Sequence, residues 1–198
     1  MFKARSPIAT LVAGGGRDGA TGERTLRIEA HPSLVLAQLA LYRDGAPQAQ
    51  AVARAVLGVD LPLSATEVSV AGDVRLYRTG PEQYWLRAPD ERTVAALSSA
   101  LDPRAGAVTP LSSSRALVSI EGAAARDVLA KGLAIDLDPA VFRVGQFAQT
   151  GLHHVGILVE RRTEQGFDLY FPRTFAVTLL EWLTDAALPF GYEMAFRA

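Results

Sequence analysis

Hydrophobic positions follow two different periods along this chain, and the two periods change in a regular order. Alternation at every second residue predicts strands at Thr25 to Ile28, Val74 to Tyr77 and Val155 to Val159. Spacing by three and four residues predicts amphipathic helices, whose apolar stripes are Ala49, Val52, Ala53 and Val56; Val94, Leu97 and Leu101; Ala125, Val128 and Leu129; and Ala176, Leu179, Leu180, Leu183 and Ala187. Gly58 is predicted to stop the first of these helices and Asp90 to cap the second, whereas the apolar run Val35 to Tyr42 is of ambiguous type. The pattern predicts an α+β protein with helices on one face of mostly antiparallel sheets.

The second half of the chain repeats the first. Leu57 to Pro62 resembles Leu133 to Pro139, and each segment follows the first helix of its half. Arg78 to Leu101 resembles Arg161 to Thr184 in the same way. We therefore predict two pseudo-repeats of strand–helix–strand–strand–helix order, over residues 24–111 and 112–198, in one compact body.

The first 23 residues are expected to form a flexible segment, with the folded body beginning near Arg24. Glycine dominates Leu11 to Glu23, and Gly14 to Gly19 matches the dinucleotide pattern G-x-G-x-x-G. That pattern needs a helix N-terminus to hold a pyrophosphate, whereas Thr21 to Ile28 alternates like a strand. A loop is the better interpretation of these glycines.

Composition excludes several classes of protein. The chain has 198 residues, no cysteine and a formal net charge of -1, which excludes disulfides, thiolate metal sites and the basic surface of a nucleic-acid-binding protein. No apolar run approaches the ~18 residues of a membrane span, and Ile8 to Ala13 is too short for a signal peptide core. We expect a cytoplasmic protein that binds neither nucleic acid nor membrane.

The hydrophobic content is high for a small soluble monomer. Hydrophobic residues make up 49% of the chain, and mean hydropathy is +0.15. A partner chain that covers apolar surface explains this, and so does a merely alanine-rich composition.

Candidate catalytic and metal-binding residues are few. The adjacent His153 and His154 cannot chelate one ion together if they lie on a strand, so they are interpreted as loop histidines without a metal. Ser112 to Ser114 lacks a nucleophile elbow and is interpreted as a turn between strands. Arg161-Arg162, with Glu160 and Glu164, is interpreted as a solvated charged turn, the alternative being an acid contact at an interface. No catalytic residue is predicted.

Taken together, residues 112–187 resemble the gamma subunit of heterotetrameric sarcosine oxidase. The resembling residues, in order, are Leu111-Ser112, Arg115, Ile120-Glu121-Gly122, Ala125-Arg126, Leu129-Ala130-Lys131-Gly132, Asp136-Leu137, Pro139, Phe142, Gly145, Ala148-Gln149-Thr150, Phe167-Asp168-Leu169-Tyr170, Arg173 and Glu181-Trp182-Leu183. The N-terminal half agrees more loosely, chiefly through Arg5-Ser6-Pro7 and Leu57 to Pro62.

That family is similar in turn to the folate-binding fold of the glycine-cleavage T-protein. The signature Thr-Gly-Glu-x-Gly-Phe-Glu of the T-protein is echoed by Arg162 to Asp168, with Thr163 in place of the first glycine and Asp168 in place of the last glutamate. The resemblance implies a remnant of a folate-type turn at Glu164, Gly166 and Asp168. Where the relatives carry a catalytic acid, this chain offers only Gln149 and Thr150.

The resemblance implies a division of labour among subunits. Large alpha and beta subunits would hold FAD, FMN, NAD and the tetrahydrofolate site, a small delta subunit would bind zinc, and this gamma chain would hold no cofactor. The complex oxidatively demethylates sarcosine to glycine, reduces oxygen to hydrogen peroxide and passes the one-carbon unit to tetrahydrofolate as 5,10-methylenetetrahydrofolate. Two alternatives are a stand-alone folate-dependent aminomethyltransferase and a folate-binding regulatory protein of the same fold.

Overall fold

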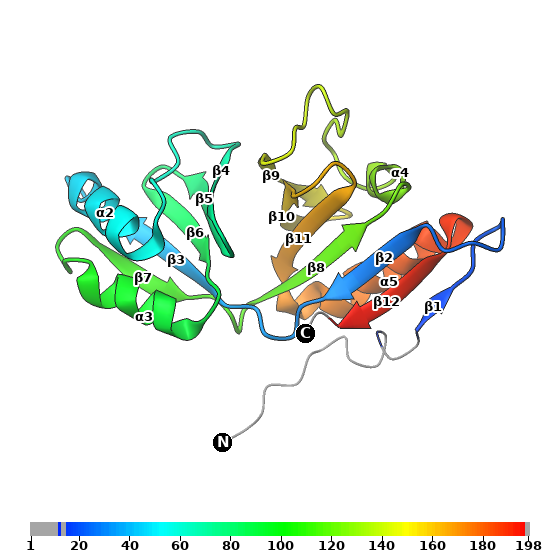
Figure 1. Cartoon of the computed structure of the whole chain (residues 1–198), viewed down its shortest axis with the longest axis horizontal. Helices are drawn as coiled ribbons and strands as arrows, with labels where there is room; N and C mark the ends of the chain where they lie inside the picture. Colours follow the sequence, from blue (N-terminus) through cyan, green and yellow to red (C-terminus); the bar gives the residue numbers. More distant parts are fainter. Residues whose placement is uncertain (1–11, 13–14, 197–198) are drawn as a thin grey trace, which may run out of the picture. The chain divides into compact units, whose positions relative to one another are not determined.

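The computed structural model describes residue 12 and residues 15–196, and it divides the chain into two units. One unit is continuous and runs from Leu34 to Ser113. The other joins the described residues up to Ser33 with those from Ser114 onward. Each unit has one sheet with its own helices, and each is described by itself (Figure 1).

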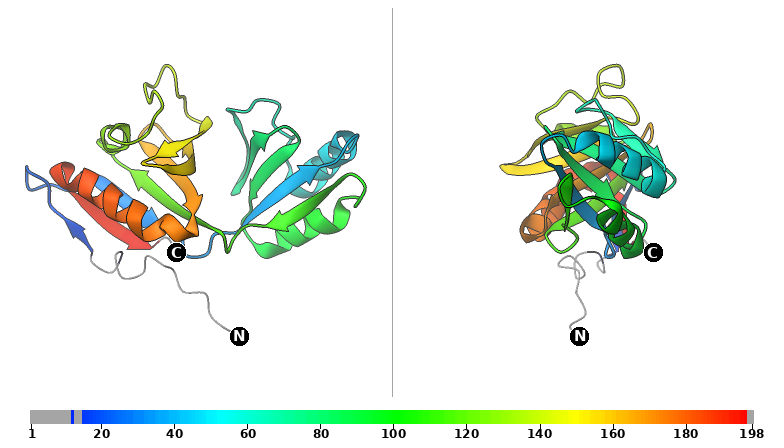
Figure 2. Two further views of the ribbon diagram at one scale, coloured as in Figure 1. Left: turned by 180° about the vertical axis from the view of Figure 1, so that it is seen from behind. Right: turned by 90° about the vertical axis from the view of Figure 1, so that its left-hand side faces the viewer.

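The continuous unit has a five-stranded antiparallel sheet in the order β4-β5-β6-β3-β7. Its elements, in chain order, are β3 (Leu36–Leu41), α2 (Ala46–Val52), a wider π turn η1 (Ala53–Leu57), β4 (Val68–Ala71), β5 (Val74–Gly80), β6 (Gln83–Arg87), α3 (Glu91–Ala100) and β7 (Gly106–Pro110). Helices α2 and α3 cover one face of the sheet (Figure 2), and Leu39, Leu76, Leu86 and Leu97 fill the core between them.

Periodicity could not assign the apolar run Val35 to Tyr42, which forms the strand β3. Leu36 and Ala37 point to opposite faces of the sheet, yet both are fully buried. The face of β3 that carries Leu36, Gln38 and Ala40 is only partly buried, but it has a single polar position, so the run lacks the alternation that marks a strand. Helix ends were more predictable, since Gly58 stops the first helix in the left-handed region at φ 71°.

Asp90 caps helix α3, as the sequence predicts. Its carboxylate accepts hydrogen bonds from the backbone N–H of Thr93 at 2.8 Å and from the Thr93 hydroxyl at 2.9 Å. These bonds, the backbone one first, hold the pKa of Asp90 below its ordinary value of 3.8.

Replacing Asp90 with alanine should therefore destabilise the fold in a pH-dependent way. A lowered pKa in the folded state means that the cap stabilises the protein above pH 3.8 and loses this effect as pH falls through the folded-state pKa. Urea midpoints at neutral pH should be lower for Asp90→Ala, and the difference should shrink below pH 3.8. The exposed Ser98→Ala on the same helix is the control, and an equal deficit at acidic pH would contradict the cap's role.

The second unit has a seven-stranded sheet in the order β1-β12-β2-β8-β11-β10-β9. Its elements are β1 (Gly16–Arg17), β2 (Leu26–Ala30), β8 (Arg115–Glu121), α4 (Ala125–Ala130), β9 (Phe147–Leu152), β10 (Val155–Arg161), β11 (Gly166–Pro172), η2 (Arg173–Phe175), α5 (Ala176–Ala187), η3 (Leu188–Phe190) and β12 (Tyr192–Phe196). Strands β12 and β2 are parallel, and the other neighbours are antiparallel.

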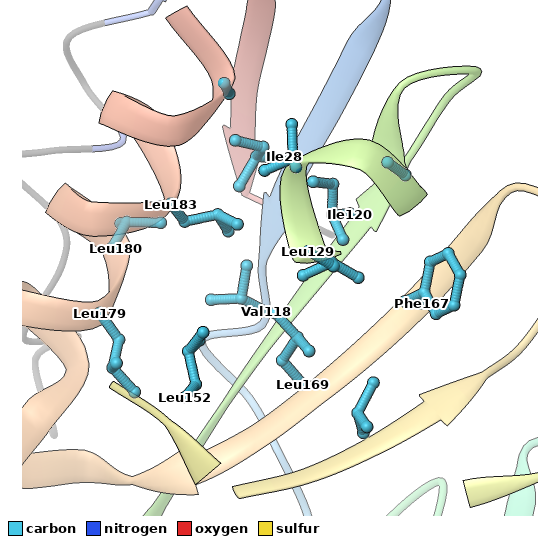
Figure 3. Packing of buried hydrophobic residues seen from close by; sticks show 14 of the residues in the cluster. Ile28, Val118, Ile120, Leu129, Leu152, Phe167, Leu169, Leu179, Leu180 and Leu183 are labelled. Atoms are coloured by element: carbon cyan, nitrogen blue, oxygen red, sulfur yellow. The ribbon is translucent and has the colours of Figure 1, made fainter. Parts of the chain in front are cut away.

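Helices α4 and α5 pack on one face of this sheet. All five residues of the stripe predicted for the last helix, Ala176, Leu179, Leu180, Leu183 and Ala187, are buried. Figure 3 shows Leu179, Leu180 and Leu183 turned toward Val118 and Leu169 of the sheet. Charged and polar residues are therefore left to the opposite face of the same strands.

The expected α+β fold with mostly antiparallel sheets is confirmed. Both units contain the predicted order, extended by a further strand before the second helix and another after it: β3-α2-β4-β5-β6-α3-β7 corresponds to β8-α4-β9-β10-β11-α5-β12. None of the described helices is long and apolar enough to cross a membrane.

Two boundaries differ from those expected. The spacing places the strand at Thr25 to Ile28 in the first repeat of 24–111, but β2 pairs with β8 and β12 and so belongs to the sheet of the second half. The folded body does not begin at Arg24, because Val12 is buried in the core and β1 pairs with β12. Long-range strand pairing causes both differences, and hydrophobic spacing does not report which strands pair.

Candidate functional site

The face of the seven-stranded sheet opposite α4 and α5 carries a row of polar residues. Glu29 on β2 is paired with Ser119 on β8, Ser119 with Asp168 on β11, and Asp168 with Glu160 on β10. Directly paired residues point to the same face, so these four side chains line up across neighbouring strands. We call them the polar row.

Asp168 is the most deeply buried charged group of the row, with no exposed surface. Its Oδ1 accepts hydrogen bonds from the Ser119 hydroxyl at 2.5 Å and from Arg162 Nε at 3.3 Å. A buried carboxylate is costly unless it is paired and hydrogen-bonded, and these donors provide both.

Arg162 joins the polar row to Glu121 at the end of β8. Its guanidinium donates to Glu121 Oε2 at 3.0 Å, and its side chain is only 17% exposed. Burial lowers the pKa of Arg162, but the carboxylates of Asp168 and Glu121 outweigh burial and raise that pKa above its ordinary value. Arg162 is therefore a fixed cation that pairs with two carboxylates.

His31 approaches the same serine but does not prepare it for nucleophilic attack. His31 Nε2 lies 2.7 Å from Ser119 Oγ, while the Ser119 hydroxyl donates its proton to Asp168. A serine nucleophile must instead donate its proton to the histidine, which a carboxylate orients from the far side. The order of hydrogen bonds here is that of a structural network.

A groove of about 420 Å³ opens beside the row and is lined by Arg27, Glu29, Ser119, Glu121 and Arg162. Charges of both signs meet in it and pair within the protein: Arg27 donates to Glu29 at 2.7 Å and Arg162 to Glu121. The groove can accept a small polar molecule. The side chains that line it supply neither a thiol nor a hydroxyl placed for attack.

The three residues predicted as a folate-type turn are near one another in sequence but do not form one site. Glu164 lies in the turn between β10 and β11, and its side chain is 83% exposed. It forms an ion pair at 3.2 Å with Arg161, whose guanidinium lies over the ring of the core residue Phe167. Asp168 points to the opposite face, with the polar row. Gly166 begins β11, where a Cβ would lie 2.5 Å from Thr163 Oγ1.

The solvated turn expected at Arg161-Arg162 is wrong. Arg161 is 3% exposed, and its guanidinium donates to the backbone oxygens of Phe142 at 2.7 Å and Glu164 at 2.8 Å. Glu160 is also buried, at 2% exposed. A run of charges is usually solvated, and only the tertiary fold shows that Glu160 and Arg161 of this one are enclosed.

The other candidate residues are not members of the polar row. His153 and His154 are exposed in the tight turn between β9 and β10, and no group of three metal-ligating side chains occurs within the described residues. Ser112 to Ser114 forms the predicted turn between β7 and β8. Gln149 and Thr150 lie on β9. In the glycine pattern, Gly16 lies in β1 and Gly14 falls outside the described residues. Arg5-Ser6-Pro7 also falls outside them.

Sequence reasoning missed Ser119, His31, Arg27 and Glu29. One signal was available for Ser119, because it is the polar position between the apolar Val118 and Ile120 and must face away from the helices. No local signal could have placed His31, which lies 88 residues away from Ser119 in sequence.

Similarity to known proteins shows the class of fold to which this chain belongs. Residues 50–196 match the family described as the GCVT N-terminal domain. The glycine cleavage system aminomethyltransferase T from Bartonella henselae is similar in structure, with a TM-score of 0.59 and 18% identity over 81% of this chain and 46% of that chain. At 18% identity, this structural likeness shows the fold alone.

Closer relatives then specify the particular family. The sarcosine oxidase subunit gamma of Corynebacterium sp. (strain U-96) is 34% identical over 94% of this chain and 91% of that protein, and its counterpart from strain P-1 is 34% identical over 72% and 71%. A chain of the heterotetrameric sarcosine oxidase from Corynebacterium sp. U-96, solved in complex with pyrrole 2-carboxylate, superposes with a TM-score of 0.84 at 28% identity, over 94% of this chain and 96% of that chain. The chain belongs to the sarcosine oxidase gamma subunit family, which has the GCVT N-terminal domain fold.

Proposed function

We propose that this chain is the non-catalytic gamma subunit of a heterotetrameric sarcosine oxidase. The complex would oxidatively demethylate sarcosine to glycine, with formation of hydrogen peroxide and 5,10-methylenetetrahydrofolate. The observation that carries the proposal is the near-complete match in both directions, over 94% of this chain and 96% of a chain in the solved heterotetramer. If the two proteins shared only one domain, much of at least one of the two chains would be left unmatched.

The geometry of the candidate site supports a structural role. Arg162 is paired with both Asp168 and Glu121, and the Ser119 proton is committed to Asp168. Under this proposal the alpha and beta subunits hold FAD, FMN, NAD and tetrahydrofolate, the delta subunit holds zinc, and the assembly is cytoplasmic.

Co-expression with candidate large subunits tests the proposal. Purification through a tag on this chain alone should yield a stable complex with a flavin absorbance spectrum, since permanent assemblies bury roughly 2,000 Å² or more of surface. A colourless protein that purifies alone, with all subunits expressed and soluble, would overturn the assignment.

A separate expectation concerns folate. Because Glu164 is bonded to Arg161 and Asp168 faces away from it, the isolated chain should show no heat on titration with tetrahydrofolate. Binding at micromolar concentration that Glu164→Ala abolishes, and that the exposed control Glu67→Ala preserves, would favour a folate-binding protein of the same fold.

A further inference from the structure

The groove beside the polar row has the size of a small-molecule site but an unusual lining. Its volume of about 420 Å³ falls within the ~300–1,000 Å³ typical of such sites, which are lined mostly by apolar side chains. Here the lining consists of two guanidinium groups, Arg27 and Arg162, two carboxylates, Glu29 and Glu121, and the hydroxyl of Ser119. A ligand of this groove must therefore be matched to charges rather than to apolar surface.

Arg162 is the most firmly held of these groups. Its Nε donates to Asp168 Oδ1 at 3.3 Å and its Nη2 to Glu121 Oε2 at 3.0 Å, and its side chain is only 17% exposed. A guanidinium held at two points has already lost most of its side-chain freedom. Little more conformational entropy is lost when such a group binds a ligand.

The ion pair between Arg162 and Glu121 leaves one donor and one acceptor unused. Arg162 Nη1 and Glu121 Oε1 form no hydrogen bond or ion pair with any residue that the structure describes. The bond between Nη2 and Oε2 of the same two groups fixes these unused atoms relative to each other. A ligand that satisfies both atoms must carry an anionic acceptor and a cationic donor only a few bonds apart.

Arg27 adds a second cation whose present partners can be exchanged. Its side chain is 55% exposed and pairs with Glu29 at 2.7 Å and with Glu193 at 3.5 Å. Exposed ion pairs contribute little to stability, so turning Arg27 toward a ligand carboxylate costs little. The planar fork of a guanidinium matches a carboxylate, which makes Arg27 suited to hold the anionic end of a ligand together with Arg162.

We propose that this groove binds a small amino-acid zwitterion, with its carboxylate held by Arg162 and Arg27 and its ammonium group held by Glu121. A ligand with a single charge would lie against like charges in a groove where both signs alternate, whereas a dipolar ligand complements both. Glycine and sarcosine belong to this class, and only the choice of these two as probes rests on the proposed function.

Nuclear magnetic resonance titration of the full chain, labelled with ¹⁵N, tests the proposal. Sarcosine and glycine should each cause saturable shifts in the backbone amide signals of Arg27 to Glu29 and of Ser119 to Gly122. We expect dissociation constants of about 1–10 mM, because the groove is open and exposed charge pairs are weak. Acetate and methylammonium, at matched ionic strength, should each bind at least about tenfold more weakly, since each supplies only half of the contacts.

Two variants identify the groups that hold the ligand. Glu121→Gln keeps the shape of the side chain but removes the charge that faces the ammonium group, and Arg27→Gln removes a donor to the carboxylate. Each should weaken binding of sarcosine about tenfold. Glu67→Gln and Arg104→Gln are the matched controls, because both side chains are exposed in the other unit, and they should leave the affinity within about twofold of the unchanged protein.

Three results would overturn the zwitterion site. These are no saturable shift with either amino acid up to about 100 mM, acetate binding as tightly as glycine, and equal loss of affinity in Glu121→Gln and Glu67→Gln. Unchanged amide signals away from the groove check that each variant is folded. The titration uses this chain without other subunits, so its failure leaves the subunit assignment intact, and a failure of co-purification leaves the titration intact.

Discussion

Replacing Asp168 with alanine is expected to lower the free energy of unfolding by about 3–5 kcal/mol, because it leaves buried donors without their acceptor. Asp168 has no exposed surface and accepts hydrogen bonds from Ser119 and Arg162. Removing it leaves the enclosed Arg162 with Glu121 as a partner but without its buried carboxylate, deprives a buried hydroxyl of its acceptor and opens a cavity in the sheet face.

Two further variants separate the loss of charge from nonspecific effects. Asp168→Asn keeps the volume and one acceptor oxygen, so it should cost less than the alanine variant, while Asp185→Ala, exposed on α5, should change stability by less than about 0.5 kcal/mol. Urea denaturation measures all three. A cost for Asp168→Ala no larger than that of the exposed control would contradict the described network.

The second large effect is expected at Gly122, where β8 ends. This glycine has φ 135°, and a Cβ would collide with the backbone oxygen of Thr25 and lie 3.0 Å from its carbonyl carbon. Gly122→Ala should cost more than about 2 kcal/mol, because strain at an unfavourable φ adds to a clash with main-chain atoms that cannot rotate away.

Gly151 on β9 is the matched control. Nothing lies within 4 Å of a Cβ at Gly151, and its φ is not positive. Gly151→Ala should be neutral or slightly stabilising, since alanine loses less chain entropy on folding. Thermal unfolding of both variants tests this contrast, which would be contradicted if Gly122→Ala unfolded at the same temperature as Gly151→Ala.

The sequence predicts those parts of the fold that depend on local spacing. The stripe of α5, the stop at Gly58 and the cap at Asp90 follow from positions a few residues apart, and all three are found. The type of β3 and the pairing of β2 with β8 depend on what covers or joins the strands. Such long-range relations leave little trace in hydrophobic periodicity.

The candidate site was less predictable than the fold. Asp168 and the Arg161-Arg162 pair were singled out, but their burial and the separation of Glu164 from Asp168 follow from the alternation of faces on β10 and β11. Ser119 and His31 carried no motif. A network of ion pairs and hydrogen bonds contains no spacing rule, since its members come from β2, β8, β10 and β11 and the residues beside them.

Under the proposed function, this chain contributes structure to an oxidase and no chemistry of its own. The most direct measurement is sarcosine-dependent formation of hydrogen peroxide by the isolated chain, by the large subunits alone and by the co-purified complex. We expect no peroxide from the isolated chain and turnover by the complex. Sarcosine oxidation by the isolated chain, free of the large subunits, would contradict it.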